Sequence, residues 1–120
     1  MKEKHDIHDI IIGILYYFPR QAEWDEIKFH ETLKDNYDQT IVKIKFGKIE
    51  KNIYSEDVGK IFDLLDLSGV ITRKHEITKI DLELLKSHYD HEIKPTFTEE
   101  ELEKLKKLSL KIQEDMKIST

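Results

Sequence analysis

The chain has 120 residues, no cysteine and a formal net charge of -5. The lack of cysteine excludes disulfides, thiolate metal ligands and cysteine nucleophiles, and the negative charge disfavours attraction of the whole molecule to nucleic acid or anionic membrane. This length is typical of one domain with its own core, so we expect a single domain over residues 1–120.

The N-terminal segment imitates a secretory signal, because Lys2 and Lys4 precede the apolar run 10–18. However, Asp6 and Asp9 interrupt the pattern, no small-residue cleavage site follows, and the run is too short to span a bilayer. We therefore expect a cytoplasmic protein without a membrane partner.

Two helices are predicted first. One should run from about Asp6 to Tyr17, where an apolar surface on nearly every side suits the centre of a core, and Pro19 should end it. A second is predicted from about Ala22 to Lys34, where apolar residues recur three and four positions apart.

Within residues 40–46 apolar and polar residues alternate, with a period of two. This pattern predicts a strand over residues 40–46 with one solvent-exposed face, ended by Gly47. Its two faces are Val42, Ile44 and Phe46 on one side, and Lys43 and Lys45 on the other. Residues 48–54 are compatible with a loop, a short strand or a single turn.

The segment from Ser55 to Ile80 has the most specific pattern. Ser55 is a hydroxyl N-cap for a helix, and Gly69 is placed to take the left-handed conformation after its end. β-branched residues on both sides of a predicted turn at 73–76 indicate a hairpin. The helix should bury one stripe, made of Val58, Ile61, Phe62 and Leu65.

Two further helices complete the chain. Asp81 should cap a helix that stops before Pro95, and Thr98 with Glu101 forms a capping box for a helix reaching about Met116. The predicted fold class is α+β, mostly α, with helices, a small antiparallel sheet or hairpin, and a long C-terminal helix at 97–118.

This order of helices, a Ser-capped helix and a hairpin resembles the winged-helix family, in which a helix packs on a small sheet and the hairpin forms the wing. The resemblance implies that helix 55–67 would enter the DNA major groove and that helix 97–118 would form a homodimer. The residues that carry it are Ser55, Val58, Ile61, Phe62, Leu65, Gly69, Val70, Ile71 and the hairpin around Lys74.

The charge on helix 55–67 opposes groove insertion, because its outer positions are mainly acidic and Lys60 is its only cation. Basic residues lie on either side of it instead. The predicted nucleic-acid-binding residues are Lys43, Lys45, Lys48, Lys51, Arg73, Lys74 and Lys79. Phe46 and Tyr54 could add stacking rings, although lysines on an edge strand also serve to prevent aggregation.

Histidines form two pairs with helical spacing, His5 with His8 and His88 with His91. If the pairs met they could form a metal site with neighbouring aspartates, but such pairs are also common on solvated helix ends, and we predict no metal and no cofactor. The His-Asp doublets also resemble those of metal-dependent phosphohydrolases.

These observations favour a small non-enzymatic winged-helix-like regulator, a homodimer that contacts duplex DNA through its wing and flanking lysines. The alternative is a protein–protein interaction module, such as an adaptor, antitoxin or immunity-type protein, that does not bind DNA. A metal-dependent hydrolase is the third hypothesis.

Overall fold

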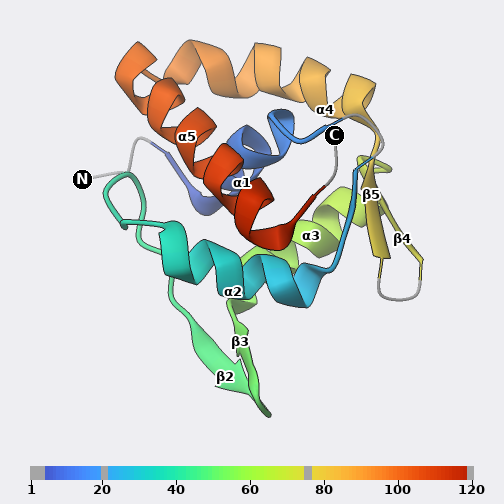
Figure 1. The fold of residues 1–120 in the computed structure, drawn as a ribbon. Helices are drawn as coiled ribbons and strands as arrows, with labels where there is room; N and C mark the ends of the chain where they lie inside the picture. The colour runs from blue at the N-terminus through green and yellow to red at the C-terminus, as the bar shows by residue number, and fades with distance from the viewer. Residues whose placement is uncertain (1–4, 20–21, 75–76, 119–120) are drawn as a thin grey trace.

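A computed structural model describes residues 5–19, 22–74 and 77–118 of the chain (Figure 1). It is mostly helical, with a small antiparallel sheet and a long C-terminal helix, which confirms the α+β, mostly α class. The elements are α1 (Ile7–Tyr16), β1 (Glu23–Trp24), α2 (Glu26–Asn36), β2 (Gly47–Ile49), β3 (Asn52–Tyr54), α3 (Glu56–Leu67), β4 (Ile71–Lys74), β5 (Ile77–Ile80), α4 (Leu82–His88), a π-helical turn (Tyr89–Ile93), a 3-10 turn (Lys94–Thr96) and α5 (Glu99–Met116).

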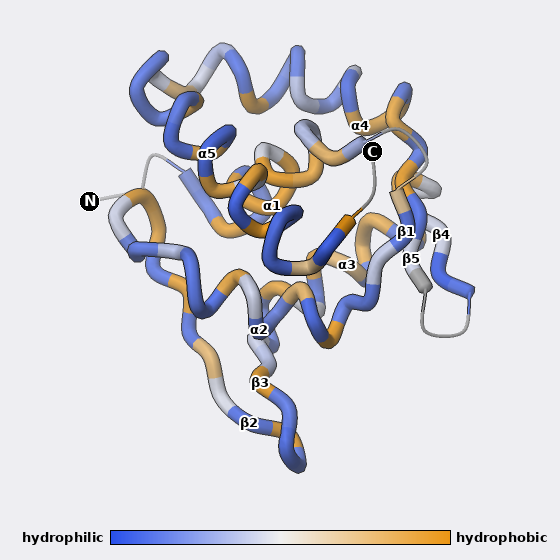
Figure 2. Tube along the Cα trace, in the orientation of Figure 1, coloured by the Kyte–Doolittle hydropathy of each residue, from blue (hydrophilic) through white to orange (hydrophobic). Residues whose placement is uncertain are grey.

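Helix α1 lies at the centre of the core, as its sequence predicted. Asp6 caps its first turn, and α3, α4 and α5 all contact it. Figure 2 shows hydrophobic residues concentrated along α1 and on the sides of the other helices that face it. The α1 side chains that are 0 % exposed are Ile10, Ile11, Ile12, Ile14 and Leu15.

Strand β5 lies between β1 and β4 in a three-stranded antiparallel sheet. The sequence did not predict β1, and it placed the start of α2 too early. The reason is that Trp24 pairs with Thr78 of β5, and the helix begins only after Asp25, whose carboxylate accepts a hydrogen bond from the Ile27 amide.

Helix α3 and the hairpin after it are confirmed. The Ser55 hydroxyl accepts a hydrogen bond from the Val58 amide at 3.3 Å, and Gly69 has a φ of 81°. The amide of Val70 then donates to the Leu65 carbonyl at 2.9 Å, which turns the chain into β4. Residues 75 and 76 of the predicted turn lie outside the described residues.

The strand predicted at 40–46 is wrong, although the alternation of buried and exposed residues is present. The backbone there bonds to side chains instead of to another strand. The Tyr37 hydroxyl donates to the Val42 carbonyl and accepts from the Val42 amide, and Gln39 bonds the amide and carbonyl of Ile44 in the same way. These bonds hold 37–44 as an irregular loop.

The segment left open at 48–54 forms the antiparallel β2–β3 hairpin, with Lys48 opposite Ile53 and a positive φ of 58° at Glu50. Figure 1 shows this hairpin projecting from the helical body between α2 and α3.

The C-terminal third differs from its prediction at one point. Asp81 caps α4, but the chain stays helical past Pro95 through the π-helical and 3-10 turns. Helix α5 then packs against α1 and α2, and Ser109 donates to the Ile14 carbonyl at 2.6 Å. Among the described helices, none has the length and hydrophobicity needed to cross a membrane.

Candidate interaction surface

Arg73 joins three elements near the sheet. From β4, its guanidinium donates to both carboxylate oxygens of Glu26 on α2, at 2.7 and 2.8 Å, and to Asp63 on α3 at 2.6 Å. Asp66 lies 3.9 Å away, and the Thr78 hydroxyl donates to Glu26 at 2.6 Å. Hydrogen bonds to Glu26 raise the pKa of Arg73 above its ordinary value, so the cation is permanent and its donors are committed within the protein.

The outward face of α3, here called the α3 face, consists of Glu56, Lys60, Asp63, Leu64 and Leu67. Lys60, the one cation on the helix, lies 3.7 Å from Glu56. Leu64 is 59 % exposed and Leu67 is 86 % exposed. This face therefore combines two apolar side chains with carboxylates, and its basic group is already paired.

The other predicted nucleic-acid contacts lie in two places. Lys79 forms an ion pair with Glu23 at 3.0 Å on the sheet, and Lys74 is exposed at the end of β4. The exposed lysines of the 37–46 loop and the β2–β3 hairpin have no carboxylate within ion-pair distance in the described part of the chain; they are Lys43, Lys45, Lys48 and Lys51.

Two of those lysines line a surface hollow of about 530 Å³ at the base of the β2–β3 hairpin. Lys45 and Lys48 border it together with the rings of Phe46 and Tyr54, and Glu56 closes it on the side of α3. The structure thus places cations and aromatic rings side by side at the edge of the α3 face.

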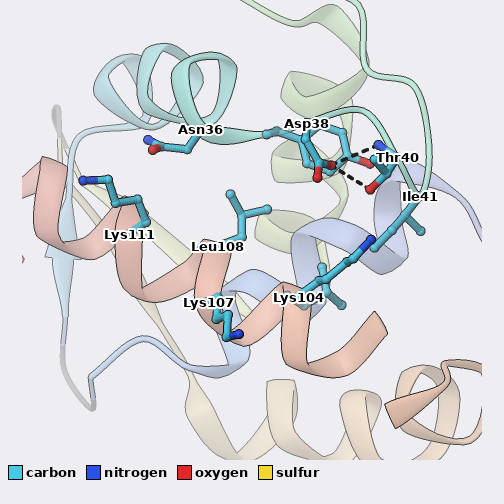
Figure 3. Close-up of a pocket in the computed structure, with 10 residues that line it drawn as sticks. Asn36, Asp38, Thr40, Ile41, Lys104, Lys107, Leu108 and Lys111 are labelled. Atoms are coloured by element: carbon cyan, nitrogen blue, oxygen red, sulfur yellow. Dashed lines mark hydrogen bonds between the residues drawn. The ribbon is translucent and has the colours of Figure 1, made fainter. Parts of the chain in front are cut away.

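A second hollow, of about 280 Å³, lies between the 37–46 loop and α5 (Figure 3). Its apolar wall includes Leu108, and three lysines spaced along α5 border it: Lys104, Lys107 and Lys111. Hydrogen bonds from Thr40 lower the pKa of Asp38 on the opposite wall. The helical spacing of the three lysines is a sequence signal for one wall of this hollow, but only the loop conformation supplies the second wall.

The structure does not bring the two predicted histidine pairs, His5 with His8 and His88 with His91, together as a four-histidine site. His8 and His88 come together, and His91 lines the same hollow of about 460 Å³. His5 lies elsewhere, stacked on Phe97 and bonded to Glu101 at 3.3 Å, so the two predicted His-Asp doublets have separate environments.

No family model, curated protein or solved structure matches this chain. The geometry described above is therefore the basis for assigning a function. Two features of that geometry have no local sequence signal: Glu26 as the partner of Arg73, and the degree of exposure of Leu64 and Leu67.

Proposed function

We propose that this chain is a small non-enzymatic regulator of winged-helix-like architecture that binds a protein partner through the α3 face. The element order α1, β1, α2, α3, β4, β5, with β5 between β1 and β4, supports the resemblance to the winged-helix family. In this interpretation α3 is the recognition helix, β4–β5 is the wing, and the β2–β3 hairpin replaces a short turn between α2 and α3.

The exposure of Leu64 and Leu67 among carboxylates is the observation that carries the proposal. Large apolar side chains at the centre of a polar rim are the usual composition of a protein-binding patch. DNA would instead meet negative charge on this helix, since Lys60 is paired with Glu56 and Arg73 with acidic groups. The partner should therefore present an apolar surface with basic groups around it.

Site-specific photo-crosslinking in the native host tests this proposal. A photoreactive phenylalanine replaces Leu67, and the same group at the exposed Lys106 of α5 is the control position. We expect a protein crosslink from position 67 that position 106 does not give and that Leu64→Asp abolishes in a chain that still folds. Crosslinks that are equal at both positions, or that capture nucleic acid, would overturn it.

Nucleic-acid binding is the second candidate, and the hollow at the base of the β2–β3 hairpin favours it. Lys45 and Lys48 could follow a phosphate backbone there while Phe46 and Tyr54 stack on bases. Anisotropy of a labelled duplex and of a single strand at about 50 mM and about 200 mM salt decides between the candidates. Salt-dependent binding that Lys45→Ala with Lys48→Ala weakens would favour nucleic acid; no binding at low salt would remove this candidate.

A homodimer remains part of the proposal, but its contact cannot be the whole of α5. That helix buries Leu105, Ile112 and Met116 within the protomer, and Leu110 is the large apolar residue on its other side, 50 % exposed. Light scattering of the wild type and of Leu110→Lys measures whether this side mediates a dimer.

A further inference from the structure

Three histidines from two distant parts of the sequence share one surface hollow. His8 comes from the first turn of α1, His88 is the last residue of α4, and His91 lies in the π-helical turn that follows. The hollow has a volume of about 460 Å³ and an apolar side that includes Leu65 and Val70. π-helical turns occur frequently at functional sites, because the wider turn changes the direction of the side chains that it carries.

The rings of His8 and His88 are separated by a distance that would suit two imidazoles on one ion. Their centroids are 4.9 Å apart and their planes are nearly perpendicular, at 89°. Two imidazoles on a tetrahedral ion have centroids roughly 5 Å apart, since each ligand nitrogen is about 2.1 Å from the metal. The distance between the two helices therefore suits a shared ion, and side-chain rotation would bring the His88 nitrogen to the group formed by Asp6, His8 and Asp9.

Two imidazole nitrogens remain available as ligands. Nε2 of His88 is buried and has no hydrogen-bond partner among the described residues. Nδ1 of His91 lies 2.8 Å from the Ser87 carbonyl, which only accepts hydrogen bonds, so Nδ1 carries the proton and Nε2 of the neutral ring keeps its lone pair. A carbonyl that fixes the tautomer of a histidine in this way is the usual outer partner of a metal ligand.

Carboxylates adjoin the histidines at the start of α1. One oxygen each of Asp6 and Asp9 closes the capping box, and the other oxygen of Asp9 lies 3.9 Å from Nδ1 of His8. The potential ligand atoms of Asp6, His8 and Asp9 all lie within 4.8 Å of one another. Mixed imidazole and carboxylate donors are typical of zinc and related divalent ions.

We propose that this hollow binds one divalent first-row transition-metal ion of the Zn²⁺ type between α1 and the end of α4. His8 and His88 are the central ligands, and His91 and Asp9 complete the set. The ion ties the two helices together, independently of the partner that the α3 face binds.

Calorimetric titration of the full chain with Zn²⁺ alone tests the site, after treatment with a chelator. We expect one ion per chain and a rise in melting temperature on binding, because the ion binds the folded state preferentially. His8→Ala and His88→Ala should each weaken Zn²⁺ binding by at least about tenfold. Unchanged affinity in both variants, or no binding by the wild type, would overturn the proposal.

Two further variants separate a lost ligand from a lost fold. His91→Gln changes an exposed residue and should also weaken binding, while His75→Ala removes a histidine outside the proposed set and should leave the affinity unchanged. Circular dichroism in chelator checks that each variant folds. In addition, Co²⁺ should give the absorption of a tetrahedral site in the wild type and lose it in His88→Ala; equal Co²⁺ spectra in the two would contradict the assignment.

Discussion

The guanidinium of Arg73 forms a bidentate ion pair with the carboxylate of Glu26, at 2.7 and 2.8 Å, and so connects strand β4 to the start of α2. Both side chains are mostly covered, with 27 % and 22 % of their surfaces exposed. Asp63 adds a third short bond from α3. The residue that the sequence offers as a wing contact for DNA therefore organises the fold beneath the α3 face.

We expect Arg73→Ala to lower the free energy of unfolding by about 2 kcal/mol or more, because it leaves the mostly covered Glu26 carboxylate without a cation, with the Thr78 hydroxyl as its remaining donor. Urea denaturation measures the change. Lys79→Ala is a matched control, since the Lys79 pair with Glu23 is exposed at 60 % and 47 %, and it should cost less than about 1 kcal/mol. Equal losses in the two variants would show that Arg73 has no organising role.

His30 should make the stability depend on pH. Its side chain is buried, and its Nδ1 accepts a hydrogen bond from the Ser55 amide at 3.1 Å, next to the cap of α3. Burial lowers the pKa of His30 from 6.5 to about 4. The folded state thus favours the neutral ring. The contribution of this ring to the free energy of unfolding is complete above the unfolded pKa, and it declines as the pH falls from about 6.5 to about 4.

In that range the unfolded state binds more protons than the folded state, so stability rises with pH, by about 3 kcal/mol in total from this residue. His30→Asn keeps an acceptor for the Ser55 amide but cannot be protonated. We expect the slope of unfolding free energy against pH between pH 4 and 6.5 to be smaller in this variant than in the wild type. Parallel slopes would assign the acid sensitivity to other groups.

Tyr37 should rigidify the loop that borders two of the hollows. Tyr37→Phe removes both bonds to Val42 and leaves a buried amide without a partner, which should cost roughly 1 to 3 kcal/mol. Hydrogen exchange at the Val42 amide should accelerate in the same variant. Tyr16→Phe is the control, because the Tyr16 hydroxyl has no hydrogen bond within the described residues; exchange that is equal in both variants would contradict the role of Tyr37.

The elements that the sequence predicts correctly have their signals close together in the chain. Ser55 and Gly69 bound α3, and Thr98 with Glu101 starts α5, because caps act within one turn. The strand expected at 40–46 shows the limit of this approach. The alternation of apolar and polar residues shows which side chains are buried. It does not show which groups the backbone amides bond to, because the bonds from Val42 and Ile44 to Tyr37 and Gln39 depend on the conformation of the loop.

The candidate sites depend on contacts between residues that are even further apart in the sequence. The histidine spacing singled out the right residue type, yet it paired His5 with His8 when the fold pairs His8 with His88. Similarly, counting charges identified Arg73 as basic but not as neutralised by Glu26. In both cases the missing information is tertiary contact between elements, which a single sequence does not give.

Leu64 and Leu65 are adjacent on α3, and they should separate binding from folding. Leu65 is 4 % exposed and Leu64 is 59 % exposed. We expect Leu65→Ala to lower the unfolding free energy by roughly 2 to 5 kcal/mol, since it leaves a cavity in the core, whereas Leu64→Ala should change it by less than about 0.5 kcal/mol. Urea denaturation compares the two variants. If the α3 face is a binding surface, Leu64→Ala should nevertheless weaken partner crosslinking from position 67, and a folded variant that crosslinks as well as the wild type would mean that partners bind elsewhere.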